Sequence, residues 1–177
     1  MRTSRDGSAW KGMLAGAIGG LAGSFAMSKF QEGWSATRKR LQPENQQNRS
    51  RRQQKQKGKD EPATLQTAQA IWKSAGGGPL NQRQKKIAGP IVHYAMGAAS
   101  GAIYGALSRY IPRAQAGRGS AFGVALWALA DEAVVPALGF SKKASRYPIS
   151  THAYGLASHL VYGLTADEVT RGIRAVL

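Results

Sequence analysis

Hydrophobic and polar residues along this chain fall into long blocks instead of a short alternating pattern. Four windows of 17 to 23 residues contain almost no charged side chain, and polar segments separate them. A helix needs roughly 20 mostly apolar residues to cross a hydrocarbon core of about 30 Å, so each window is near that length. We therefore expect an all-α polytopic membrane protein, a single membrane domain over residues 1–177 with transmembrane helices at 12–30, 87–111, 119–141 and 147–170.

Glycine and alanine dominate these windows, and in several of them glycine recurs every four residues. A glycine inside a helix costs about 1 kcal/mol relative to alanine in water, whereas in lipid small residues let helix backbones approach closely. The pattern therefore favours tightly packed spans and self-association of the chain. The alternative is a soluble helical domain with alanine-rich core helices. The glycines that we expect at helix contacts are Gly16, Gly20, Gly97, Gly101, Gly105, Gly123, Gly155 and Gly163.

A basic insert at residues 31–86 separates the first expected span from the second. Its centre, residues 38–59, carries nine Lys and Arg against one Glu and is rich in Gln, so we expect the insert to be largely disordered. A short amphipathic helix near residues 62–75, with Trp72 on its apolar face, is typical of a helix that lies in a membrane interface. The net charge of the chain, +16, indicates anionic partners.

Anionic lipid and nucleic acid are the two partners that such a basic segment could bind. Each Lys or Arg close to an anionic membrane contributes about 1 kcal/mol, so nine of them would hold the loop on the surface of the lipid bilayer. Residues 38–59 include no aromatic side chain on which bases could stack, which disfavours nucleic acid. The residues that we expect to bind anionic lipid are Arg38, Lys39, Arg40, Arg49, Arg51, Arg52, Lys55, Lys57 and Lys59.

Two adjacent acidic residues, Asp131 and Glu132, lie inside the third apolar window. Carboxylates at membrane depth are rare, and they face the interior of a helix bundle, where they serve function. Pro136 cannot donate a hydrogen bond to the carbonyl of Glu132, so we expect a kink beside the two carboxylates. The alternative is that the helix breaks near Pro136 and the acidic pair lies among lipid headgroups.

All three histidines also lie in the uncharged windows. His152 and His159 are seven residues apart and share one face of the last span, and His93 precedes the glycines of the second span. Together with Asp131 and Glu132 they make up the intramembrane polar cluster that we expect. Such a cluster could relay protons or bind a cation, because histidine titrates near physiological pH. The alternative is that the histidines only form hydrogen bonds between helices.

Local signals also predict helix ends. Acidic residues followed by Pro62 are typical of a helix start, and Pro90 suits the first turn of the second span. Near the other end of the chain, Asp167 and Glu168 stand four and three residues before Arg171. Pairs at these spacings meet on a helix surface, so we expect an ordinary solvated helix end there.

Signatures of catalysis are missing from the sequence. It has no cysteine, no G-x-S-x-G nucleophile motif, no G-x-x-x-x-G-K-[ST] phosphate loop and no histidine spacing typical of a metal site. We therefore expect a protein that is not an enzyme and that binds neither a cofactor nor a metal ion.

Several runs along the chain are similar to one known family: GPIVHYAMGAASGAIYGAL, FGVALWALADEAVVPALGFS, YPISTHAYGLASHLVYG and DEVTRGIRAVL. They resemble the YagU-like family, bacterial inner-membrane proteins grouped by a domain of unknown function. The resemblance covers roughly residues 12–30 and 62–174, and the insert at residues 38–59 is not part of it. It implies a small multi-pass protein of the bacterial cytoplasmic (inner) membrane, with no activity to carry over.

Three functions are compatible with these patterns. The first is an integral inner-membrane protein whose polar interior handles protons or a small solute. The second is a non-transporting membrane scaffold or stress-related protein, whose basic loop binds lipid or a partner. The third is a soluble basic nucleic-acid-binding protein, which high salt would release from membranes. Replacing Asp131 and Glu132 with Asn and Gln separates the first two, because a scaffold should keep its role.

Overall fold

The computed structural model describes residues 3–41, 61–108, 110–111, 115–140 and 144–177, and every regular element in these ranges is helical. The all-α class expected from the sequence is therefore confirmed. In chain order the elements are α1 (Thr3–Leu41), α3 (Ala63–Ser74), α4 (Gln82–Leu107), α5 (Ser120–Trp127), the π-helical segment η2 (Ala128–Val134), α6 (Val135–Ala137), the 3₁₀ turn η3 (Ala144–Arg146) and α7 (Ile149–Val176).

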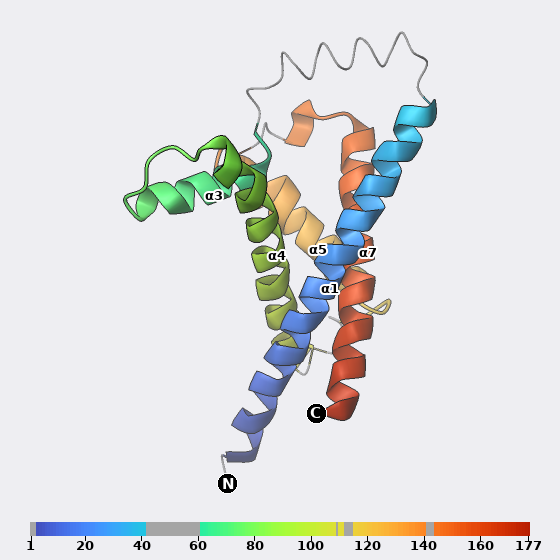
Figure 1. Ribbon diagram of the computed structural model, residues 1–177. Helices are drawn as coiled ribbons and strands as arrows, with labels where there is room; N and C mark the ends of the chain where they lie inside the picture. The colour runs from blue at the N-terminus through green and yellow to red at the C-terminus, as the bar shows by residue number, and fades with distance from the viewer. Residues whose placement is uncertain (1–2, 42–60, 109, 112–114, 141–143) are drawn as a thin grey trace.

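The central helix is α1, which packs against both α4 and α7 (Figure 1). Its 39 residues extend well beyond the span expected at 12–30, into the segment that we expected to be disordered. The extension has a physical reason: no proline interrupts the chain before Pro43, and three basic residues in the last turn suit the negative end of the helix dipole. Residues 42–60, the rest of the basic centre, lie outside the described part of the chain.

Glycines form the contact between α1 and α4. Gly16 lies against Gly101 and Gly105, and Gly20 lies against Gly97 and Gly101, so the two helices run antiparallel with backbones in direct contact. A Cβ atom added at Gly16 would overlap the carbonyl oxygen of Gly101. Only glycine allows helix axes to approach this closely, because any side chain would separate the two backbones.

The contact between α5 and α7 uses glycine in the same way. Gly123 of α5 lies against the backbone of His159, and Gly163 of α7 packs against Gly123 in return. Gly155, one turn before His159, leaves room for the side chains of Trp127 and Asp131. The glycines of α7 therefore bring its histidine face close to η2.

Side chains are distributed with polar groups inside and apolar groups outside. The largest fully buried side chains are Tyr104, Thr170, Asp167, Ser24 and Ser158. By contrast, Phe25, Ile91 and Leu129 are each more than half exposed, as are many other large apolar side chains of the described residues. A soluble protein buries its large apolar residues and exposes its charges. Along the long helices of this chain, by contrast, many large apolar side chains are exposed, and small polar side chains and Asp167 fill the interior.

The start of α4 corrects one prediction. We expected Pro90 in the first turn of the second span, but α4 begins at Gln82 and contains Pro90 in its interior. Asn81 determines the earlier start, because its side chain accepts a hydrogen bond from the Gln84 backbone N–H while the Gln84 side chain accepts one from the Asn81 N–H. This reciprocal pair satisfies two N–H groups that a helix start would otherwise leave unpaired.

The short helix α3 begins at Ala63, directly after Pro62, close to the amphipathic helix expected near residues 62–75. It packs on the first turns of α4 and lies across the long helices (Figure 1). The side chain of Gln66 donates a hydrogen bond to the carbonyl of Phe140, which ties α3 to the chain after α6. α3 therefore covers one end of the space between α4 and η2.

Candidate functional site: two carboxylate–histidine pairs beside a cavity

The helix that carries the acidic pair changes its hydrogen-bonding pattern at that point. From Ala128 to Val134 it is π-helical, and the Val135 N–H donates to the Ala130 carbonyl five residues back. Pro136 explains the change, because it has no N–H to bond the Glu132 carbonyl in α geometry. Instead of the expected kink within a span over 119–141, the chain widens into a π turn and the helix ends at Ala137. Single π turns of this kind occur often at functional sites.

Glu132 pairs with His152 of α7. The Nδ1 atom of His152 lies 2.6 Å from the Glu132 Oε1 atom, and both side chains are about three-quarters buried. A carboxylate can only accept in this contact, so the histidine Nδ1–H donates. The contact is therefore a short, charge-assisted hydrogen bond between η2 and α7.

Asp131 stands beside His159, two turns further along α7. The His159 Nδ1 atom is 3.6 Å from the Asp131 Oδ2 atom. This distance is too long for a hydrogen bond, and it is short enough for an ion pair when the histidine is protonated. The Nδ1 atom of His159 lies 3.0 Å from the Gly155 carbonyl oxygen. Because a carbonyl only accepts, Nδ1 carries the proton and donates it there. The Asp131 carboxylate consequently receives no short hydrogen bond from His159.

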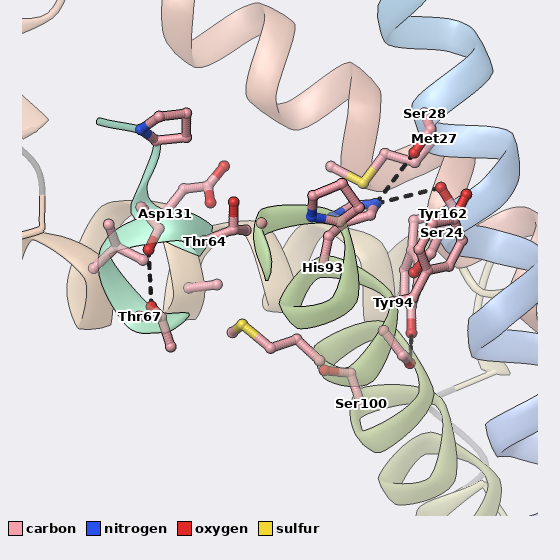
Figure 2. Close-up of a pocket in the computed structure, with 18 of the residues that line it drawn as sticks. Ser24, Met27, Ser28, Thr64, Thr67, His93, Tyr94, Ser100, Asp131 and Tyr162 are labelled. Carbon is pink, nitrogen blue, oxygen red and sulfur yellow. Dashed lines mark hydrogen bonds between the residues drawn. The ribbon is translucent and has the colours of Figure 1, made fainter. Parts of the chain in front are cut away.

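A cavity of about 580 Å³ opens on the Asp131 side of this cluster. Its walls come from α1, α3, α4, the α5–η2 helix and α7, and Figure 2 shows polar side chains of these elements turned toward it. A second cavity of about 180 Å³ lies between η2 and the start of α7, where Glu132 and His152 line it. Asp131 lines both cavities.

His93 lies on the opposite wall of the large cavity, on α4. Its Nε2 atom is 3.3 Å from the Ser24 carbonyl oxygen and 3.4 Å from the Ser28 hydroxyl, both on α1 (Figure 2). The structure therefore brings Asp131, Glu132, His152 and His159 together at the contact between η2 and α7. It separates His93 from them across the cavity.

The far part of the bundle holds a buried carboxylate that sequence reasoning missed. Asp167 is only 2% exposed, where we expected a solvated helix end. Tyr104 of α4 donates a hydrogen bond to it, and Arg171 forms an ion pair with it at 2.9 Å. Glu168 faces the other way, is exposed, and pairs with Arg171 and Arg118. The spacing of acidic and basic residues predicted the ion pairs of Asp167 and Glu168 with Arg171. It gave no sign that Tyr104, from a distant helix, would bury Asp167.

Three of the nine residues expected to bind anionic lipid lie in the described part of the chain. Arg38, Lys39 and Arg40 form the exposed last turn of α1. The other six, Arg49, Arg51, Arg52, Lys55, Lys57 and Lys59, lie outside the described residues.

Residues 78–168 match a family described as protein of unknown function (DUF1440), and the match covers about half of the chain. The chain belongs to the DUF1440 family. The part matched to DUF1440 contains α4, η2 and most of α7, and with them both carboxylate–histidine pairs, while α1 and α3 precede it. No curated protein and no solved structure matches this sequence.

Two helices among the described residues are long and apolar enough to cross a membrane: Ala9–Leu41 within α1, and Ser120–Ala137. Only 6% of the second is buried, whereas the core helix of a soluble domain is mostly buried. α4 and α7 occupy the positions of the second and fourth expected spans, and they do not pass this test. Glycine, serine, histidine and charged ends lower the hydropathy of both helices.

Proposed function

We propose that the chain is an integral membrane protein of four spans, and that its polar interior passes protons or a small solute. α1, α4, the α5–η2–α6 segment and α7 are the spans. Asp131 with His159 and Glu132 with His152 form the site. No catalytic role, cofactor or metal ion is part of this proposal.

The observation that carries the proposal is the distribution of side chains, apolar outside and polar inside. In water, exposed side chains such as Phe25, Ile91 and Leu129 would cost roughly 1.5–3 kcal/mol each relative to burial. In a bilayer the same surface is solvated, and helices associate through small residues and polar contacts. The glycine contacts of α1 with α4 and of α5 with α7 match that mode of packing. This packing also supports α4 and α7 as spans, since Tyr104 of α4 and Ser158 and Thr170 of α7 are buried.

The acidic pair supports a role in proton transfer or solute binding. A carboxylate facing lipid is costly, about 2.5–3.5 kcal/mol at the centre of a span, and such groups mark ion or proton pathways when they face an interior. Histidine next to each carboxylate supplies a group that gains and loses protons near neutral pH. A scaffold would need neither the pairs nor the cavities between them.

The resemblance to YagU-like proteins supports placement in the bacterial cytoplasmic membrane, and the DUF1440 match is compatible with that placement. The exposed basic turn at the end of α1 supports contact with anionic lipid headgroups. A scaffold or stress-related role, with this basic region as the binding surface, is the second function that we propose. The exposed turn Arg38–Lys39–Arg40 is the observation that favours it.

Two experiments, membrane fractionation and then a flux measurement, test the proposal. Membranes from cells that express the full chain are washed with high salt and then with carbonate, and a spanning protein should stay in the pellet until detergent is added. Release by salt would refute membrane insertion and favour a peripheral, nucleic-acid- or lipid-binding protein.

The second step uses purified protein in vesicles with a trapped pH-sensitive dye and an imposed proton gradient. The double variant Asp131→Asn/Glu132→Gln should slow flux at least about tenfold, because the groups that exchange protons are gone. Glu168→Gln is the matched control, since it makes the same chemical change at an exposed helix end. Equal flux in all three proteins would favour the scaffold.

A further inference from the structure

A single carboxylate stands among the described side chains around the large cavity. Asp131 is the only acidic residue among the described side chains that line it. The only lysine there, Lys85, is neutralised by Glu61 at 2.6 Å. His159 donates its Nδ1 proton to the Gly155 carbonyl and not to Asp131, whose Oδ2 atom is 3.6 Å from that nitrogen, so no short hydrogen bond from His159 occupies the carboxylate. The cavity as a whole is complementary to a monovalent cation.

Apolar side chains from three helices line the cavity together with polar ones. Met27 of α1, Met96 of α4 and Leu126 of α5 line the cavity, as do the aromatic rings of Tyr94 and Tyr162. Methionine adapts to ligands of varied shape, and tyrosine faces attract organic cations. No group of three or more His, Cys, Asp or Glu side chains suited to a metal ion occurs among the described residues.

A buried hydroxyl lies behind the α1 wall of the cavity. Ser24 lines the cavity on the α1 side, and its Oγ atom is buried without a hydrogen-bond partner among the described groups. That hydroxyl packs against Gly97 of α4, where an added Cβ would overlap it, so it belongs to the contact between α1 and α4 directly behind the cavity wall. It lies on the same wall as the His93 contact, across the cavity from Asp131 (Figure 2).

We propose that this cavity binds a small organic cation with an apolar body, whose positive group pairs with Asp131. The inference rests on the proposed function, because it names the solute class for the same interior. A volume near 580 Å³ is in the range of sites that enclose drug-sized ligands. The Met and Leu walls take the apolar body, and the carboxylate selects cations over anions of equal shape.

Tetraphenylphosphonium and tetraphenylborate test this directly, because they have nearly the same shape and opposite charge. Binding of each to the purified full chain in detergent micelles is measured by equilibrium dialysis. The cation should bind saturably at one site per chain, and the borate should show no saturable binding. Asp131→Asn should weaken cation binding at least about tenfold, which corresponds to 1.4 kcal/mol. Glu168→Gln in the same micelles should bind like the unaltered protein.

A second variant keeps the test decisive if Asp131→Asn fails to fold. Ala130→Phe fills the cavity from the η2 side without changing any charge, and it should also abolish saturable binding. Undiminished binding in either folded variant, or equal binding of the borate, overturns the inference. If the protein stays in carbonate-washed membranes and supports proton flux but binds no tetraphenylphosphonium, only this inference is overturned and the proposed function stands. Release from membranes by salt instead refutes the proposed function.

Discussion

Tyr104 of α4 and Asp167 of α7, 63 residues apart in the chain, meet in the interior of the bundle, where the tyrosine hydroxyl donates a hydrogen bond to the carboxylate. Both side chains are at most 2% exposed. Arg171 balances the charge from one turn away. A buried carboxylate that loses a hydrogen-bond donor bears its full desolvation cost. This contact joins α4 and α7 together with two others, from the Tyr162 hydroxyl to the Gly97 carbonyl and from the Arg174 side chain to the Gly105 carbonyl.

Tyr104→Phe should therefore destabilise the protein. Removing one hydrogen bond to a buried charged group costs about 1.5–3 kcal/mol, and the ring itself stays in place. Thermal unfolding in detergent measures the effect. Tyr110→Phe is the control, because Tyr110 is 61% exposed and its substitution should change little. Equal unfolding temperatures for the two variants would contradict the importance of the buried contact.

Gly101→Ala should weaken the contact between α1 and α4. The added Cβ would overlap the Gly16 carbonyl and the Gly20 backbone, so the helices must separate, at a cost of about 1–3 kcal/mol or more. Gly172→Ala on α7 is the matched control, since no atom lies near its Cβ position and alanine favours a helix by up to about 1 kcal/mol. The two substitutions are expected to shift the unfolding temperature in opposite directions, and a stabilised Gly101→Ala protein would refute the close contact.

Pro136→Ala should convert the π turn into a regular α-helix. The new N–H can bond the Glu132 carbonyl, and the acidic pair then rotates relative to α7. The natural chain has no cysteine, so a Glu132→Cys/His152→Cys pair can report the geometry. Formation of a cross-link between the two thiols by a short bifunctional thiol reagent should be efficient with Pro136 present and much slower in the Pro136→Ala background. Unchanged formation would mean that proline does not set the π turn.

The exposed turn at the end of α1 should hold anionic lipid. Replacing Arg38, Lys39 and Arg40 with Gln removes charges that contribute about 1 kcal/mol each near an anionic surface. Native mass spectrometry of the purified protein should then detect fewer bound phosphatidylglycerol molecules than for the unaltered chain. Phosphatidylcholine is the lipid control, and its retention should not change. A loss of both lipids to the same degree would indicate a general folding defect.

Several features of this protein follow from local sequence alone. Long uncharged windows predicted helices and no strands, because nothing in them alternates with a period of two. Glycines every four residues predicted faces of close approach, since that spacing places them on one side of a helix. His152 and His159 were expected on one face for the same reason, and the structure places both on the face of α7 that meets η2.

Helix ends were harder to predict because short-range contacts compete there. Asn81 and Gln84 start α4 earlier than Pro90 suggested, and α1 continues to Leu41 through a segment whose composition is typical of disorder. Mean composition says little about a helix that is already nucleated and packed along its first turns. Sequence patterns locate such elements well and their boundaries poorly.

Periodicity and spacing thus determined the helical class, the glycine faces and the histidine face, because each is a property of neighbours within one helix. Only the tertiary structure decided which charges are buried. Asp167 and Glu168 are adjacent and look alike in sequence, yet Tyr104 covers the first and leaves the second exposed. Likewise, the contact of η2 with α7 gives Glu132 a short hydrogen bond and leaves Asp131 facing a cavity. Burial depends on what distant segments place nearby, and that information is not local.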